Sequence, residues 1–194
     1  MEQNRHIILA SFSPRRKELL EKIGLKFSVD PGDFSEDLNG ETDPEGLAEL
    51  LSMGKAMAVA KKYPDAIIIA ADTFGVLRGK IIGKPHDRQE AIKMLQALSG
   101  KSHRVITGFT VFDVPTNKRV TRSVETRVYL KKLSAAEIEN YVNSGEPLDK
   151  AGAYAIQGLG AVIVEKIVGD YYNVMGLPLC ALSEVLKEFG IRVL

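Results

Sequence analysis

The chain has 194 residues, of which 45% are apolar and 26% are charged, and its formal net charge is +1. These are ordinary values for a globular protein of one domain, with a small second lobe as the alternative, and they exclude a global electrostatic field that recruits nucleic acid or membranes. The single cysteine, Cys180, excludes a disulfide framework and a cysteine-based zinc site, and its apolar neighbours predict a small core residue.

Two further features bear on location. No stretch of the sequence is long enough to span a bilayer, and the apolar run near the N-terminus is too short for a signal peptide. We therefore expect a cytoplasmic protein in a reducing compartment, without a membrane partner.

Hydrophobic periodicity and turn residues predict strands and helices that intermingle along a single domain over residues 1–194. The first half of the pattern predicts a buried strand at 6–11, a helix at 13–23, a short strand at 27–29, an acidic loop at 33–43, a helix from 43 to about 63, a central strand at 66–71 and a small hairpin at 76–82. The second half predicts a helix at 87–98, two long strands at 105–114 and 119–130, a helix that starts with a capping box at 134–137, a glycine-rich loop at 145–160, a strand at 161–168 and a helix near 179–189. The expected fold is α/β, a mixed twisted sheet with flanking helices and loops gathered in a central cleft, with two lobes around that cleft as the alternative arrangement.

The segment Ser13-Pro14-Arg15-Arg16-Lys17 connects the first predicted strand to the first predicted helix. Proline is well placed in a first helical turn, where its missing N–H costs nothing, and the free N–H groups there carry partial positive charge. Two arginines and a lysine at this point are typical of a polyanion site, and phosphate is the first candidate. A solvated basic turn is the alternative.

Carboxylates occur at two further points of the chain. Asp72 and Thr73 directly follow the apolar run at 66–71, and α/β sheets bind ligands just beyond the carboxyl ends of their strands. Asp72 at such a point is suited to hold a divalent metal or to activate water. Glu36 and Asp37 in the acidic loop supply carboxylates that would complete a magnesium site with Asp72. A turn aspartate and an ordinary charged loop are the alternatives.

Two lysines are candidates for positive charges near phosphate. Lys84 lies between Gly83 and Pro85, where the backbone is stiff. Lys55 follows Gly54 inside the second predicted helix, and a glycine there costs on the order of 1 kcal/mol relative to alanine, which indicates close backbone packing. Solvated surface lysines are the alternative in both cases.

The segment 149–160 is rich in small residues, which allow a ligand to approach the backbone closely. Gln157 offers an amide donor and acceptor and Tyr154 offers a ring for stacking, a combination that suits a nucleobase. A structural turn is the alternative. Together with the cations and the carboxylates, this segment predicts an enzyme that hydrolyses the phosphoanhydride of a nucleotide with a divalent metal.

Seven sequence blocks, read in order, resemble the Maf (septum-formation-inhibitor-like) nucleoside triphosphate pyrophosphatases. The resemblance covers nearly the whole chain, from Ile8 to about Gly190. The blocks are LASFSPRR at 9–16, ADT at 71–73, GKP at 83–85, LSGKSH at 98–103, GEPLDKAGAY at 145–154, IQG at 156–158 and VMGLPL at 174–179.

This resemblance implies cleavage between the α- and β-phosphates, which gives a nucleoside monophosphate and pyrophosphate. It also implies a divalent cation (Mg²⁺ or Mn²⁺), a homodimer, and a fold like that of inosine triphosphate pyrophosphatases. In the family pattern Asp72 matches the proposed general base and metal-binding carboxylate, and Glu36 matches the carboxylate of the acidic loop.

The same resemblance implies contacts to the substrate's phosphates. Arg16, Lys55 and Lys84 match the phosphate-contacting cations of the family, and Ser13 lies in the same loop as Arg16. Two positions depart from the family pattern. Gly54 stands where the family usually has Glu, which would weaken the positioning of the metal or of Lys55, and Ala155 stands where Gly is common, which should matter little.

Three residues indicate the branch of the family. Arg15, Thr73 and Gln157 match the branch acting on dTTP and UTP, whereas the branch acting on 7-methyl-GTP typically has Trp, Gln and Glu at these positions. A neutral amide pairs with a uracil-type edge, and a carboxylate suits a base that presents N–H donors or positive charge.

The sequence therefore predicts a metal-dependent dTTP/UTP pyrophosphatase whose partner is a nucleoside triphosphate. The alternatives are a pyrophosphatase for modified nucleotides such as 7-methyl-GTP and a nucleotide-binding regulator of cell division. The net charge of +1 and the lack of a long basic stripe argue against nucleic acid as a partner.

Overall fold

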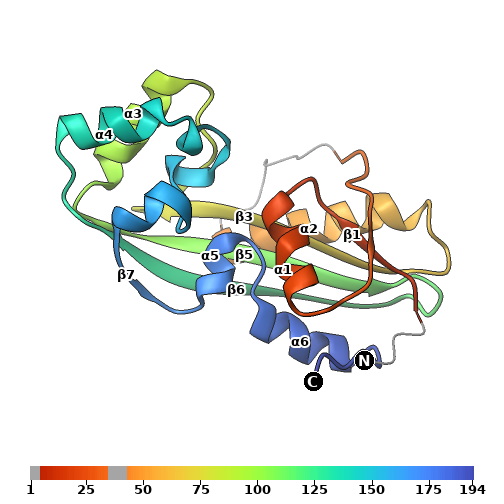
Figure 1. Cartoon of the computed structure of the whole chain (residues 1–194). Helices are drawn as coiled ribbons and strands as arrows, with labels where there is room; N and C mark the ends of the chain where they lie inside the picture. Colours follow the sequence, from red (N-terminus) through yellow and green to blue (C-terminus); the bar gives the residue numbers. More distant parts are fainter. Residues whose placement is uncertain (1–4, 35–42) are drawn as a thin grey trace. The chain divides into compact units, whose positions relative to one another are not determined.

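The computed structural model describes residues 5–34 and 43–194. Its elements are shown in Figure 1. The strands are β1 (Ile7–Ala10), β2 (Ser28–Val29), β3 (Ile67–Leu77), β4 (Lys80–Ile82), β5 (Ser102–Asp113), β6 (Lys118–Leu130) and β7 (Val164–Val168). The α-helices are α1 (Pro14–Lys22), α2 (Pro44–Ala60), α3 (Arg88–Leu98), α4 (Ala135–Asn143), α5 (Tyr171–Met175) and α6 (Leu179–Lys187), and the 3₁₀-helices are η1 (Glu146–Asp149), η2 (Ala151–Ala153) and η3 (Gly158–Val162).

The strands form one seven-stranded mixed sheet. Its order is β2-β1-β3-β5-β6-β7, and β4 also pairs with β3. β1 runs parallel to β2 and to β3, so that Ile7 lies opposite Ile67 and Ala10 opposite Ala70. β4 runs antiparallel to β3, and β7 antiparallel to β6. The predicted α/β class with a mixed sheet and flanking helices is therefore confirmed.

The chain divides into two compact units. The first unit comprises Met1–Asp72, Thr107–Val124 and Met175–Leu194, and the second comprises Thr73–Ile106 and Glu125–Val174. The boundaries fall within β3, β5, β6 and α5. The single domain over 1–194 and the central cleft stay predictions.

In the first unit, α2 covers one face of β1 and β3. Because side chains alternate between the faces of a strand, Ile8 and Ile68 lie on the same face as Ala10 and Ala70. These residues pack with Ala56, Val59 and Ala60 of α2 and with Phe112 of β5. The backbone of α2 comes very close to β5, since a Cβ atom on Gly108 would lie 2.0 Å from the carbonyl oxygen of Ala48.

In the second unit, α3 and α4 lie side by side over the core (Figure 1). Buried side chains of α3 (Ala91, Leu95 and Leu98) and of α4 (Ile138, Tyr141 and Val142) pack with Val128 and Leu130 of β6. Ala153, Tyr154 and Ile163 from the segment that follows α4 complete this cluster. The glycine-rich segment is therefore anchored on the core of its unit.

Polar side chains cap the starts of α1, α2, α3 and α4. Ser13 and Asp43 precede α1 and α2 and accept hydrogen bonds from the N–H groups of Arg16 and Gly46. Asp87 caps α3 in the same way. The predicted capping box of α4 is complete, because Ser134 accepts from the backbone of Glu137 while the Glu137 carboxylate accepts from the backbone of Ser134.

The structure corrects several sequence-based expectations. The strand predicted at 161–168 begins only at Val164, because Gly158 has a φ of +65° and the segment Gly158–Val162 forms a 3₁₀-helix instead. The strand predicted at 105–114 begins three residues earlier, at Ser102, and α5 was not predicted. No helix within residues 5–34 and 43–194 combines the length and the apolar character that crossing a membrane requires.

Cys180 was also predicted wrongly. Its side chain is exposed rather than buried. The buried residues of α6 are Leu179, Leu182, Val185 and Leu186, which recur at helical spacing, and Cys180 falls outside this stripe. Its apolar neighbours in the sequence therefore gave a misleading signal.

Candidate functional site

The loop between β1 and α1 forms the predicted turn from strand to helix. Ser13 caps α1 in an extended conformation, and its Oγ accepts a hydrogen bond from the backbone N–H of Arg16 at 3.5 Å. Pro14 occupies the first turn, where it removes an N–H that would have no helical partner. The Ser13 N–H donates in turn to Ser11 Oγ at 3.1 Å, which holds the loop tightly.

The two arginines of this loop differ in their surroundings. Arg16 donates from Nε to the carbonyl oxygen of Gly176 at 2.7 Å and from Nη1 to Ser11 Oγ at 3.1 Å. These bonds orient its guanidinium and connect the loop to the segment before α6. The half-exposed Arg15 has no side-chain partner among the described residues, so its guanidinium is available to a ligand. Sequence reasoning did not single out Ser11 or Gly176, although both lie in blocks that carry the family resemblance, LASFSPRR and VMGLPL.

Asp72 lies within a strand and not beyond its end, which corrects the expectation from the sequence. β3 continues to Leu77 because Phe74 and Val76 are buried and because Gly75 to Leu77 pair with β4. The pairing of β3 with β1 ends at Ala70, and its pairing with β4 begins at Gly75. Asp72 therefore lies in the part of β3 between the residues that pair with β1 and the residues that pair with β4.

Lys55 of α2 forms an ion pair with Asp72. Alternation along β3 places Asp72 on the same face as Ile68 and Ala70, which is the face that α2 covers. Lys55 Nζ donates a hydrogen bond to Asp72 Oδ1, and the two side chains are only 19% and 14% exposed. A lysine and a carboxylate from two elements, 17 positions apart in sequence, are thus brought together in a partly desolvated setting.

Gly54, which departs from the family pattern, lies against Phe34. A Cβ atom at position 54 would lie 2.3 Å from Cε2 of the Phe34 ring and 2.4 Å from its Cζ. The expectation of close packing at this glycine is therefore confirmed, and the neighbour is an aromatic ring rather than a backbone. A Glu side chain at this position would need the ring to move.

The remaining predicted residues lie in the second unit. Thr73 is half-buried and, by alternation along β3, points to the face opposite Asp72. Lys84 is exposed in the GKP turn, whose Gly83 carbonyl oxygen accepts from the N–H of Gly152 at 2.9 Å. Gln157 is exposed directly before η3. The side chains of Lys84 and Gln157 have no partner among the described residues.

Tyr154 cannot offer a stacking face, contrary to the prediction. Its side chain is 5% exposed within the core of the second unit, and its Oη forms a hydrogen bond of 2.8 Å with Nε2 of the buried His103. Burial lowers the pKa of His103 to about 4, so this imidazole is neutral at pH 7. Tyr154 and His103 are therefore core residues of the unit.

The described residues hold one carboxylate of the predicted metal site, Asp72. Glu36 lies outside the described residues, and residues 5–34 and 43–194 contain no group of three His, Cys, Asp or Glu side chains that could hold a metal ion. Asp72 is the one described carboxylate of the predicted set, and only its Oδ1 is engaged, by Lys55. A single carboxylate oxygen suits Mg²⁺, which commonly takes one or two carboxylates and completes its shell with water and substrate phosphates.

Comparison with protein families and with known proteins gives concordant matches. A family model described as "Maf-like protein" matches residues 6–189. A protein of Alkaliphilus metalliredigens named "dTTP/UTP pyrophosphatase" is 52% identical over 97% of this chain and 98% of its own length. A protein of the same name from Methanococcoides burtonii is 50% identical over 97% of both chains.

One solved structure supports the fold. The structure of a HAM1 protein from Coxiella burnetii superimposes with a TM-score of 0.54, at 17% sequence identity, over 95% of this chain and 99% of that protein. At this level of identity the likeness concerns the arrangement of strands and helices alone.

Proposed function

The chain belongs to the Maf-like protein family, and from this membership we infer that it is a hydrolase acting on nucleoside triphosphates, a dTTP/UTP pyrophosphatase. The observation that carries this conclusion is the 52% identity, over 97% of the chain, to a protein with that name. The protein converts dTTP or UTP to the nucleoside monophosphate and pyrophosphate, and so belongs to nucleotide metabolism.

We assign the proton-accepting step to Asp72. In the reaction, a water oxygen attacks the α-phosphorus, and the bond from that phosphorus to the oxygen bridging the β-phosphorus breaks. Lys55 donates to Oδ1 of Asp72 and so orients the carboxylate, which we assign to accept the proton of the water. The electron pair of the broken bond leaves with pyrophosphate.

Stabilisation of the negative charge is assigned to the cationic side chains. Arg15 and the N-terminal end of α1 offer hydrogen-bond donors in the first unit, with Ser13 and Arg16 shaping the loop that presents them. Lys84, exposed and without a protein partner among the described residues, is assigned as a phosphate-contacting cation. Charge stabilisation of this kind supplies much of the rate enhancement in phosphoryl transfer.

A divalent cation, Mg²⁺ or Mn²⁺, is part of the proposal. Asp72 would hold it together with Glu36, and when bound it would neutralise charge on the triphosphate. Selection of the base is assigned to Arg15, Thr73 and Gln157, because the neutral Gln157 amide can both donate to and accept from a uracil-type edge.

A cytoplasmic location and a homodimer complete the proposal. The single cysteine suits a reducing compartment, and the dimer rests on the family resemblance. Sedimentation of the purified protein at several concentrations tests the dimer directly.

The first experiment is an assay of pyrophosphate release from dTTP, UTP, CTP and 7-methyl-GTP, with Mg²⁺, Mn²⁺ or EDTA. We expect release that requires metal and favours dTTP and UTP. A preference for 7-methyl-GTP would leave the reaction in place and contradict the choice of substrate. Absence of release from all four nucleotides would contradict the function, and the Asp72→Asn protein purified in parallel controls for contaminating phosphatases.

A further inference from the structure

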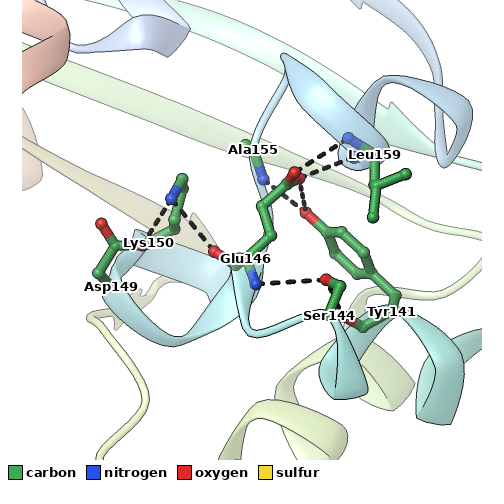
Figure 2. A network of polar contacts seen from close by, with 8 residues as sticks. Tyr141, Ser144, Glu146, Asp149, Lys150, Ala155 and Leu159 are labelled. Atoms are coloured by element: carbon green, nitrogen blue, oxygen red, sulfur yellow. Dashed lines mark hydrogen bonds and ion pairs between the residues drawn. The ribbon is translucent and has the colours of Figure 1, made fainter.

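A half-buried carboxylate in the second unit, that of Glu146, organises the segment that carries Gln157 (Figure 2). Glu146 follows α4 at the start of η1, and its carboxylate accepts backbone hydrogen bonds from Leu159 at 3.0 Å and from Gly160 at 2.9 Å. These two residues lie thirteen and fourteen positions further along the chain. The carboxylate therefore acts as a bridge between the end of α4 and η3.

Tyr141 of α4 extends this bridge to a third backbone group. Its Oη donates to Glu146 Oε1 at 2.8 Å and accepts from the N–H of Ala155 at 3.0 Å. The side chain of Tyr141 is 6% exposed, so this hydroxyl works in a setting where an unsatisfied polar group is costly. Figure 2 shows the Glu146 carboxylate and the Tyr141 hydroxyl meeting between Ala155 and Leu159.

The three anchored N–H groups bracket Gln157. Ala155 lies two residues before it and Leu159 two residues after it, and both are tied to the same pair of side chains. Gln157 itself is exposed and has no protein partner among the described residues. The network thus fixes the backbone on both sides of this residue and leaves its amide for a ligand.

Two glycines show how closely this network is fitted. A Cβ atom on Gly158, which has a φ of +65°, would lie 2.4 Å from Glu146 Oε2. One on Gly160 would lie 2.1 Å from the carbonyl oxygen of Ala155 and 2.6 Å from Tyr141 Oη. The network therefore leaves no room for a side chain at either glycine. Burial raises the pKa of Glu146, but the hydrogen bonds from Tyr141, Gly160 and Leu159 outweigh it, so that the net pKa lies below the ordinary value.

We propose that Glu146 and Tyr141 are positioning residues that set the preference of the enzyme for a uracil-type base by holding the segment of Gln157. This inference rests on the proposed function, since it names residues that shape base selection in the same enzyme. Neither side chain needs to touch the substrate, because each acts on the backbone that carries the selecting amide.

The test compares Glu146→Gln and Tyr141→Phe with the unmodified protein in two measurements. The first is hydrogen exchange of the amides of Ala155, Leu159 and Gly160, which does not depend on activity. We expect faster exchange at all three amides in Glu146→Gln, because an amide group presents one acceptor where the carboxylate presents two. Tyr141→Phe should act most strongly at Ala155.

The second measurement is kcat and KM for UTP and CTP. We expect the ratio of kcat/KM for UTP over CTP to fall by about tenfold in Glu146→Gln, chiefly through a higher KM for UTP, with kcat changed by less than about threefold. Such a split separates positioning of the base from the chemical step. A purely structural role would instead lower kcat for both nucleotides in the same proportion.

Glu137→Gln is the matched control. Glu137 is also a carboxylate of the second unit that accepts a backbone hydrogen bond, from Ser134 at 2.8 Å, but no hydrogen bond or ion pair joins it to the described segment 155–160. An unchanged base preference in Glu146→Gln and Tyr141→Phe, or an equal shift in Glu137→Gln, would overturn the proposal. If the unmodified protein releases no pyrophosphate, the proposed function itself is contradicted. If the unmodified protein is active and prefers UTP, and the two variants keep that preference, only the positioning role of Glu146 and Tyr141 is contradicted.

Discussion

The ring of Phe34 lies where a side chain on Gly54 would begin. A Cβ atom at position 54 would be 2.3 Å from Cε2 of that ring, a separation that real Cβ atoms do not show. The glycine next to Lys55 is therefore matched to an aromatic residue from the loop before α2, and the departure from the family's usual Glu at position 54 has a local cause in this chain.

Gly54→Ala should destabilise the protein. Alanine is favoured over glycine inside a helix by about 1 kcal/mol, but displacing the Phe34 ring costs more, and we expect a net loss of about 1 kcal/mol in the free energy of unfolding. Urea denaturation gives this value from the midpoint and the slope of the transition.

The same substitution in a Phe34→Ala background is the control for this explanation. Without the ring, Gly54→Ala should stabilise by about 0.5–1 kcal/mol through helix propensity alone. A stabilising effect of Gly54→Ala in the unmodified chain would show that the ring moves away without cost.

The sequence predicted the turn between β1 and α1 correctly but predicted that β3 ends too early, and each outcome has a physical reason. The start of α1 is encoded locally, by Ser13 as a cap and Pro14 in the first turn, so these two adjacent residues indicate where the helix begins. The continuation of β3 beyond Asp72 depends on β4, which pairs with β3 only from Gly75 onward. Neither Asp72 nor Thr73 gives a sequence signal for that pairing. Prediction from the apolar run alone therefore ended the strand too early.

In the candidate site, too, the sequence identified individual residues but not the contacts that depend on packing. Lys55 and Asp72 were both identified as candidates from the sequence, but their ion pair follows from how α2 packs on β3, which involves residues 17 positions apart. Tyr154 was misassigned because an aromatic side chain beside small residues suits both a stacking site and a core. Only its burial and its hydrogen bond to His103 distinguish the two.

Asp72→Asn should abolish turnover and leave the fold intact. The amide cannot accept the proton of the attacking water, and we expect kcat to fall by about a thousandfold, within the usual range for loss of a general base. Steady-state pyrophosphate release measures kcat, and the far-ultraviolet circular dichroism spectrum checks the fold. Asp65→Asn, an exposed aspartate in the turn before β3, is the control and should keep full activity. Activity retained in Asp72→Asn would reject the assigned role.

Substitution of Arg15 should affect mainly substrate binding, whereas substitution of Arg16 should also lower the free energy of unfolding. Arg16→Ala removes the hydrogen bonds to the Gly176 carbonyl oxygen and to Ser11 Oγ, so we expect a loss of about 1–2 kcal/mol in unfolding free energy in addition to lower activity. Arg15→Ala should raise KM for UTP and leave stability within about 0.5 kcal/mol, because the Arg15 side chain has no partner among the described residues. Denaturation and kinetics on both variants test this pair of statements, and equal stability losses would contradict it.

His103 should make the stability of the protein depend on pH between about 6.5 and 4. The side chain is 4% exposed, and among the described residues its Nδ1 has no hydrogen-bond partner, so burial lowers its pKa from 6.5 to about 4. Within this window the unfolded chain binds a proton that the folded chain does not bind, and stability therefore falls as the pH falls, by about 1.4 kcal/mol per pH unit and about 3 kcal/mol in all. The contribution is fully present above pH 6.5, and below pH 4 this group causes no further loss.

His103→Gln keeps a polar group that can bond to Tyr154 and does not titrate, so the difference in unfolding free energy between the two proteins should shrink by about 2 kcal/mol between pH 7 and pH 5. Carboxylates are common to both proteins and cancel in this comparison, so parallel pH profiles would show that His103 does not titrate with a lowered pKa.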